Sequence, residues 1–160
     1  MAKAKKSKAK KQKQLDALDL LRRDHADVKK AFKEFEKAKY KDPNACKEFV
    51  ASICKAIEMH ATVEEEIFYP AVRERIKDDD LMNEALVEHN SAKQLIAEIR
   101  RLSGDDPMLK ASAMVLSEYV NHHVREEENQ MFPKARRLKL DLEGLAEKML
   151  ARKDELKGRE

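Results

Sequence analysis

Six side chains of the kinds that ligate metals interrupt the apolar stripes of this 160-residue chain. They are four histidines and two glutamates: His25, His60, Glu64, His89, His123 and Glu127. Residues four apart on a helix project to the same side, so His60 with Glu64 and His123 with Glu127 form two pairs of donors. A carboxylate among Leu, Ile and Phe is strongly disfavoured unless it is paired or binds a metal ion. The pattern therefore predicts a buried metal site.

The two pairs also lie in an internal repeat, segments 60–70 and 123–133. Each reads His, then Glu at offsets four and five, then an aromatic residue and a proline at offsets nine and ten. A single such pair is more often surface chemistry, and a single buried histidine is more often a packing residue. Four histidines on four segments, two of them in a repeated motif, favour a ligand set. We expect Pro70 and Pro133 to kink or end their helices.

The elements that must position these groups are helices. Apolar residues recur every three or four positions between turn signals near residues 41–44, 78–80, 103–107 and 138–141. Only seven residues are Gly or Pro, which excludes a turn-rich β fold. The sequence predicts an all-α, up-down-up-down four-helix bundle over residues 15–155, followed by a tail at 156–160. A short fifth helix, with Leu142, Leu145 and Met149 on one side, is expected to pack on the outside. At 1.5 Å of rise per residue, the six groups fall within about two or three turns of one layer.

The donor set also selects the metal. Nitrogen and carboxylate ligands without thiolate suit non-haem iron, and manganese or zinc less well. Six ligands exceed what one tetrahedral zinc takes, whereas two metals bridged by Glu64 and Glu127 would use all of them. The Glu-x-x-His pairs of ferritin-like di-iron sites and the His-Glu-x-x-His motif of metalloproteases are absent from the sequence.

Over roughly residues 15–155 the chain resembles a hemerythrin-like (HHE) cation-binding domain. The matching residues are Asp24-His25, His60, Glu64, Glu88-His89, His123 and Glu127. The resemblance implies a four-helix bundle that holds two non-haem iron ions with a bridging oxo or hydroxo group. It also implies reversible binding of O2, or a role in responses to iron, oxygen, nitric oxide or peroxide.

One position departs from the oxygen-carrying members of that family. They have a second histidine four residues after the third-helix histidine, and this chain has Lys93 there. We expect Lys93 to extend toward solvent and His122 to take a surface or second-layer role. Glu88 is expected either to orient a ligand histidine or to be solvated. Tyr69 is the phenol closest in sequence to a donor pair, and no role is assigned to it.

The net charge of +3 divides unevenly along the chain. Residues 1–14 hold seven Lys and no acid, so residues 15–160 hold 27 basic and 31 acidic residues, or −4. The arm is expected to be disordered and either solubilising or a non-specific contact for nucleic acid, with lipid the weaker option.

The sequence also predicts where the protein resides. No apolar run of membrane-spanning length and no secretory signal is expected. Cys46 and Cys54, eight residues apart, are too distant on one helix to bridge, which favours a cytoplasmic protein.

Three functions follow from these observations. The leading hypothesis is a non-haem di-iron protein that binds O2, nitric oxide or peroxide, with weak turnover of the last two left open. The alternatives are an iron- or oxygen-responsive sensor acting through a partner, and a metal-free helical interaction module.

Overall fold

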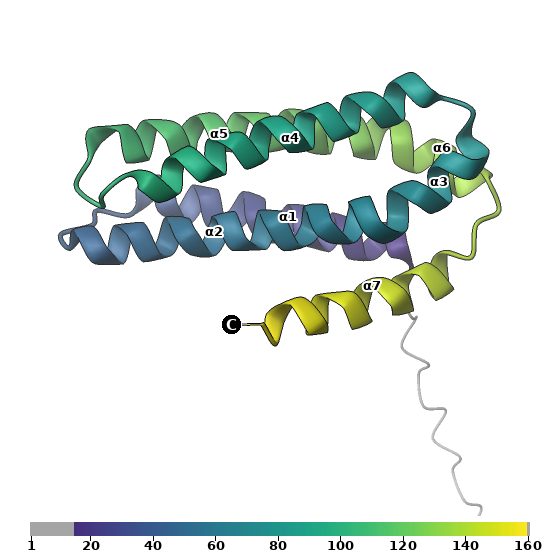
Figure 1. The fold of residues 1–160 in the computed structure, drawn as a ribbon, viewed down its shortest axis with the longest axis horizontal. Coiled ribbons are helices and arrows are strands. Elements are labelled where there is room, and N and C mark those ends of the chain that lie inside the picture. The colour runs from purple at the N-terminus through teal and green to yellow at the C-terminus, as the bar shows by residue number, and fades with distance from the viewer. Residues whose placement is uncertain (1–14, 160) are drawn as a thin grey trace, which may run out of the picture.

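The computed structural model describes residues 15–159, and throughout that range its regular structure is helical (Figure 1). The expected basic arm, residues 1–14, and Glu160 lie outside the described residues. The elements are α1 Ala17–Lys37, α2 Pro43–Val63, η1 Glu64–Phe68, α3 Tyr69–Ile76, α4 Asp79–Arg101, α5 Pro107–Glu126, η2 Glu127–Met131, α6 Phe132–Arg137 and α7 Leu142–Lys157.

Four rods form the bundle, because α2, η1 and α3 run on as one helical rod and α5, η2 and α6 as another. Helices α1 and α4 each contact both α2 and α5, so the four rods enclose a common interior (Figure 1). The up-down-up-down bundle predicted from the sequence is confirmed. The expected fifth helix is α7, which lies outside the bundle against α1, α2 and η1 (Figure 1).

Aspartates begin the helices where the turn signals were expected. Asp16, Asp42, Asp78, Asp106 and Asp141 are the N-cap residues of α1, α2, α4, α5 and α7, and each side chain accepts a hydrogen bond from a backbone N–H of the first turn. A carboxylate there satisfies an unpaired donor and faces the positive end of the helix dipole.

Of the two outcomes expected at the prolines of the repeat, a kink or an end of the helix, the structure excludes the end of the helix. A single π-helical stretch precedes each proline, η1 before Pro70 and η2 before Pro133, and the helices continue to Ile76 and Arg137. The wide turn carries the backbone past the proline ring, and α3 leaves the line of α2 (Figure 1).

The π turns also change which side chains point inward. With regular α-helical spacing Ile67 would follow Glu64 into the core, but Ile67 is only half-buried. Phe68 and Tyr69 are buried instead, and Met131 and Phe132 are buried in the second rod. The extra residue in each wide turn therefore brings an aromatic ring to the interior at offset nine of the repeat.

The apolar core is divided in two along the bundle. One cluster, which includes Leu18, Leu21, Met82 and Phe132, lies toward α3, α6 and α7. The other, which includes Phe32, Ile53, Ile96 and Leu116, lies toward the opposite end. In α1 and α4, His25 and His89 fall between the residues of the two clusters, so a polar layer separates them. Within residues 15–159, no helix is long and apolar enough to span a membrane.

Candidate metal centre

The structure brings the six predicted groups together in this polar layer, which we call the His/Glu cluster: His25, His60, Glu64, His89, His123 and Glu127. They form two sets of four whose donor atoms lie within 4.8 Å of one another. One set contains His25 and His60, the other contains His89 and His123, and both share Glu64 and Glu127. The two carboxylates therefore stand where they could bridge two cations.

The imidazoles point their Nε2 atoms at the shared carboxylates. The Oε1 atom of Glu64 is 2.9 Å from Nε2 of His60 and 3.3 Å from Nε2 of His89. The Oε1 atom of Glu127 is 2.5 Å from Nε2 of His123 and 3.8 Å from Nε2 of His25. Each carboxylate thus contacts one histidine of its own rod and one from a neighbouring helix.

The carboxylates are buried without hydrogen-bond partners. Glu64 is 0% exposed and Glu127 is 1% exposed, and none of their four oxygens has a hydrogen-bond partner. The Nε2 atoms of His25 and His60 also lack one. Buried polar atoms are nearly always satisfied, because leaving one unpaired is costly. Two cations between these atoms would satisfy the orphaned oxygens and nitrogens together, so the donor set fits a two-metal site.

A second layer of carboxylates faces the other ring nitrogen of each histidine. Nδ1 lies 3.0 Å from Glu128 in His25, 2.9 Å from Asp24 in His60, 3.3 Å from Glu65 in His89 and 3.1 Å from Glu88 in His123. A carboxylate at Nδ1 favours the proton on that nitrogen and leaves the Nε2 lone pair directed inward. Hydrogen bonds therefore hold His25, His60 and His123 in the orientation that a metal ligand needs, whereas Nδ1 of His89 lies near Glu65 without a hydrogen bond.

The charged groups of the cluster shift one another's pKa values in opposite directions. Burial acts to lower the pKa of His60, but the charge of Glu64 and the hydrogen bond that His60 donates to Asp24 outweigh it and raise that pKa to about 10. Burial together with the charge of Glu64 raises the pKa of Glu127 to about 8. Burial and the neighbouring charge of His60 lower the pKa of His25 to about 4. Without a cation, the cluster therefore holds protons at the positions where a metal would bind.

The cluster has an approximate internal two-fold correspondence that Tyr69 breaks. The motif His60, Glu64, Glu65 corresponds to His123, Glu127, Glu128, and Asp24-His25 corresponds to Glu88-His89. At offset nine, the Tyr69 hydroxyl lies 3.2 Å from Nε2 of both His89 and His123. The corresponding Phe132 instead stacks on His25 with ring centroids 5.8 Å apart. Only the half of the cluster built on His89 and His123 therefore has a phenol beside it.

The structure also places the residues whose roles were left open. Lys93 turns outward, and its Nζ lies 2.7 Å from Glu65, the carboxylate behind His89. His122 is exposed, and its Nε2 is 3.2 Å from Glu126 and 3.5 Å from Glu88. Glu88 hydrogen-bonds a cluster histidine, but that histidine is His123 rather than its neighbour in sequence. Cys46 and Cys54 are both free thiols.

Helix α7 is attached to this second layer. Lys153 contacts the Asp24 carboxylate that holds His60, and both side chains are less than one-fifth exposed. Arg152 pairs with Glu66 of η1 through a 2.7 Å contact. The outer helix therefore contacts the surroundings of the His/Glu cluster through two ion pairs.

A small cavity, which we call the inner cavity, adjoins all four cluster histidines. It encloses about 50 Å³ and is walled mainly by apolar side chains, among them Val28, Ile57, Ile96, Val120 and Val124. A space of this size holds a molecule of a few heavy atoms beside the cluster histidines.

Sequence reasoning missed most of the second layer. Glu65 and Glu128 are the second acids of the two Glu-Glu pairs in the repeat, and that repetition was the available signal. The role of these second acids became clear only in the structure, where Glu65 faces His89 and Glu128 faces His25, both on neighbouring helices. Helix α7 carries no motif that would have connected Lys153 with Asp24.

Comparisons with known proteins agree with this architecture. Residues 16–135 match the family model described as the hemerythrin HHE cation-binding domain. A curated DNA nickase from Nostoc sp. (strain PCC 7120) is 33% identical over 114 residues, which is 71% of this chain but 32% of the nickase. The chain thus spans about one-third of the length of that relative.

A solved structure has the same fold. It is a hemerythrin HHE cation-binding domain-containing protein from Mycobacterium kansasii, with a TM-score of 0.78 at 22% identity, covering 91% of this chain and 89% of that one. The family match extends over three-quarters of the sequence and includes every residue of the His/Glu cluster. The chain belongs to the hemerythrin HHE cation-binding domain family.

Proposed function

We propose that this protein holds two non-haem iron ions in the His/Glu cluster and binds a small ligand there, such as O2, nitric oxide or peroxide. His25 and His60 would hold one ion, His89 and His123 the other, and Glu64 and Glu127 would bridge them. The observation that supports the proposal best is the burial of both glutamates with four oxygens lacking hydrogen-bond partners. Nitrogen and oxygen donors without thiolate favour iron over zinc in such a set.

The chain's own residues define what the centre would do. The bound irons would supply the redox chemistry and the affinity for O2, nitric oxide or peroxide. Asp24, Glu65, Glu88 and Glu128 orient the imidazoles, and the apolar walls of the inner cavity exclude bulk water and charged molecules of larger size. The Tyr69 hydroxyl, 3.2 Å from two cluster nitrogens, can donate a hydrogen bond on one half of the site.

Metal analysis of protein purified without added iron tests the proposal. We expect about two irons per chain, lost in His123→Ala and in Glu127→Ala. His122→Ala is the matched control, because this neighbouring histidine is exposed and should leave the iron content unchanged. Protein that binds no metal would instead support the metal-free interaction module, and one zinc per chain would contradict the two-metal assignment.

A second candidate, a metal-responsive regulator, is favoured by the contacts of α7. Lys153 connects this helix to Asp24 and thus to His60, so a change in the charge of the centre acts on the docking of α7. If the protein is a regulator, hydrogen exchange in α7 should differ markedly between metal-free and iron-loaded protein. Equal protection in both forms would favour a simple carrier.

A further inference from the structure

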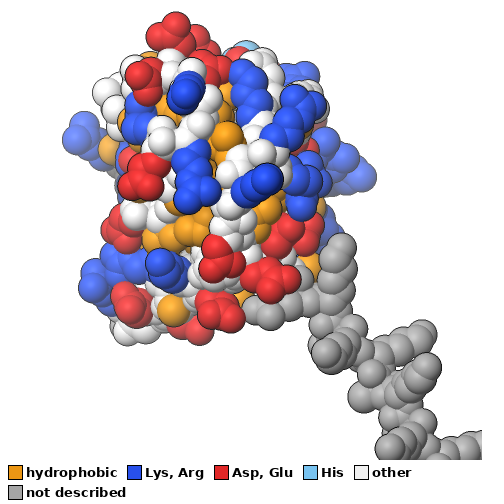
Figure 2. All heavy atoms as spheres, turned by 90° about the vertical axis from the view of Figure 1, so that its right-hand side faces the viewer, with side chains coloured by type: hydrophobic (Ala, Val, Ile, Leu, Met, Phe, Trp, Pro, Cys, Tyr) orange, Lys and Arg blue, Asp and Glu red, His pale blue; other side chains and the backbone are white. Residues whose placement is uncertain are grey.

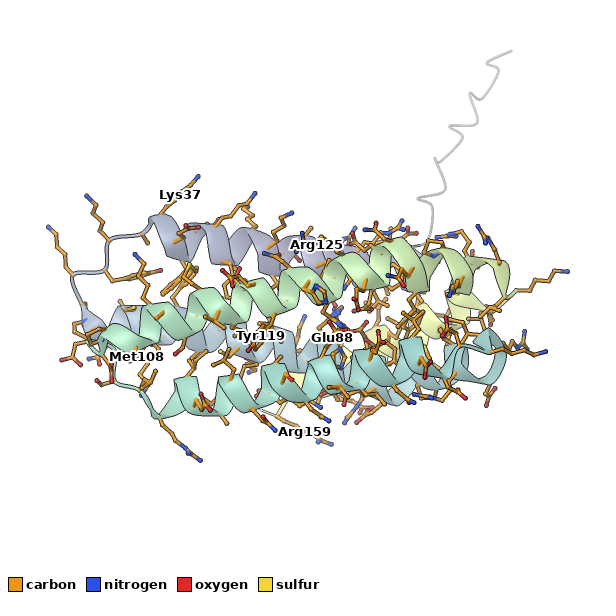
Figure 3. The ribbon with its side chains drawn as sticks, turned by 90° about the horizontal axis from the view of Figure 1, so that it is seen from above. Lys37, Glu88, Met108, Tyr119, Arg125 and Arg159 are labelled. Atoms are coloured by element: carbon orange, nitrogen blue, oxygen red, sulfur yellow. The ribbon has the colours of Figure 1, made fainter. Side chains whose placement is uncertain are left out.

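Two grooves run along opposite sides of α5, and their charges are opposite. The one toward α4 is lined by Asp80, Glu84, Glu88 and Glu126 together with His122. The one toward α1 has a volume of about 410 Å³ and is lined by Arg22, Lys29 and Arg125, with Glu128 its only acidic group. We call the second the basic groove. Figure 3 shows Arg125 on the α1 side of α5 and Glu88 between α5 and α4.

The cations of the basic groove are not neutralised by neighbours. Arg22, Lys29 and Arg125 are all exposed, and none of them forms an ion pair with a residue in 15–159. The one acid, Glu128, accepts from Nδ1 of His25 at 3.0 Å. This differs from the far side of α5, where His122 lies among carboxylates. The positive potential of the groove is therefore available to a molecule from solution.

The floor of the basic groove is continuous with the metal centre. His25 lines both the basic groove and the inner cavity, and Val120 and Val124 line both as well. Both valines are half-buried and stand on one face of α5. A small molecule in the groove is thus separated from the inner cavity by two aliphatic side chains and one imidazole.

We propose that the basic groove is a binding and entry site for small monovalent anions, which pass Val120 and Val124 to reach the His/Glu cluster. This rests on the proposed metal centre and specifies the route by which inorganic anions of two to three heavy atoms reach it, along the α1 side of α5. A groove lined by one sign of charge raises the local concentration and the association rate of the opposite charge. The acidic groove on the α4 side repels the same ions, so of these two grooves the basic one is the side from which they enter.

Azide association with the iron-loaded protein, followed by stopped-flow absorbance, tests the proposal kinetically. A unit charge at about 8 Å in water changes a local ion concentration about twofold to threefold. The triple variant Arg22→Gln, Lys29→Gln, Arg125→Gln should therefore bind azide about tenfold more slowly at low salt. The difference should vanish near 0.5 M salt, where screening is nearly complete.

Matched controls distinguish the effect of charge in the groove from the effect of net charge and from the effect of the valine wall between groove and inner cavity. Lys37→Gln, Lys47→Gln, Lys110→Gln makes the same change in net charge on exposed lysines outside the groove and should leave the azide rate within about twofold. Nitric oxide, a neutral probe, should associate equally fast with the wild type and the groove variant. Val124→Phe should slow both azide and nitric oxide, because it narrows the shared wall. An azide rate that is the same in the groove variant and the wild type would overturn the proposal.

A measurement on metal-free protein tests anion binding in the groove separately from metal binding at the centre. In amide NMR spectra of metal-free protein, azide should shift Asn121 and Arg125, which line the groove, and the triple variant should lose those shifts. If the protein binds no iron but these shifts occur, the proposed metal function fails while the anion site stands. If iron binds but azide shifts no groove amide and the azide association rate does not depend on salt, the proposed anion site is wrong and the metal function stands.

Discussion

Loading the metal-free protein with iron at neutral pH should release protons from inside the bundle. The pKa of His60 is raised to about 10 and that of Glu127 to about 8, so both hold a proton at pH 7. The pKa of His123 is also raised: burial acts to lower it, but the charge of Glu127 in close contact and the hydrogen bond to Glu88 outweigh that effect. A metal needs the lone pairs that these protons occupy. We therefore expect two to three protons to leave as the two metals enter.

The magnitude follows from the distance of each pKa from neutral pH. Removing a proton at pH 7 costs about 4 kcal/mol at His60 and about 1 kcal/mol at Glu127, since each pKa unit is worth about 1.4 kcal/mol. From pH 6.5 to 7.5 the apparent binding constant for the full metal pair should rise almost a hundredfold from these two groups alone. His123 would add up to a further tenfold.

Calorimetry in buffers of different ionisation enthalpy counts the released protons, and chelator competition at the two pH values gives the affinity ratio. Asp24→Asn removes a charge that raises the pKa of His60, so this variant should release fewer protons and show a shallower pH dependence. Asp27→Asn, an exposed acid three residues away, is the matched control and should behave like the wild type. A binding heat that is the same in every buffer, with an affinity that ignores pH, would refute the electrostatic picture of the cluster.

The metal-free protein should lose stability as pH rises from 7 to 10, because the raised pKa of His60 makes the folded state bind more protons than the unfolded state in this range. The iron-loaded protein should show no such loss. Denaturant unfolding of both forms across this pH range tests the prediction. Tyr69→Phe should destabilise the metal-free protein by about 1 kcal/mol through the lost hydroxyl contacts and speed ligand release, and Phe132→Tyr, which supplies a hydroxyl to the other half, is the comparison in stopped-flow decay. Lys153→Met should weaken the docking of α7 by about 1 kcal/mol through its lost ion pair with Asp24, seen as faster exchange of α7 amides; unchanged exchange would show that apolar packing alone holds α7. Deleting residues 1–14 should abolish any salt-dependent binding of duplex DNA in an electrophoretic titration, and retained binding would locate the contact on the folded body.

The bundle and its polar layer were accessible from the sequence because both depend on spacing along one helix. Leu18, Leu21, His25, Val28 and Phe32 are all buried, as their spacing of three and four residues predicts. Aspartates and prolines marked the helix starts because their effect on the backbone is local. The error at Pro70 has a physical cause, since a π turn lets a helix pass a proline that an α turn would not accommodate.

The distribution of charge over the surface could not be predicted from the sequence. The sequence showed a −4 average for residues 15–160, and that average hides how charges of one sign gather. Figure 2 shows one end of the bundle, where basic side chains are most frequent on one side and acidic side chains lie around and below them. The opposite charges of the two grooves beside α5 likewise depend on which helix lies on each side of it.

By itself the sequence determined which residues share a helix face, and hence the identity of six inward donors and two repeated pairs. Only the tertiary structure decided which donors meet across helices, because distance between helices depends on packing and not on sequence separation. It set Glu128 against His25 and Glu88 against His123, pairs separated by 103 and 35 positions. It also placed the Tyr69 hydroxyl beside one half of the cluster and left the other half with Phe132, since the wide turns rotate both rings inward but only one carries an oxygen.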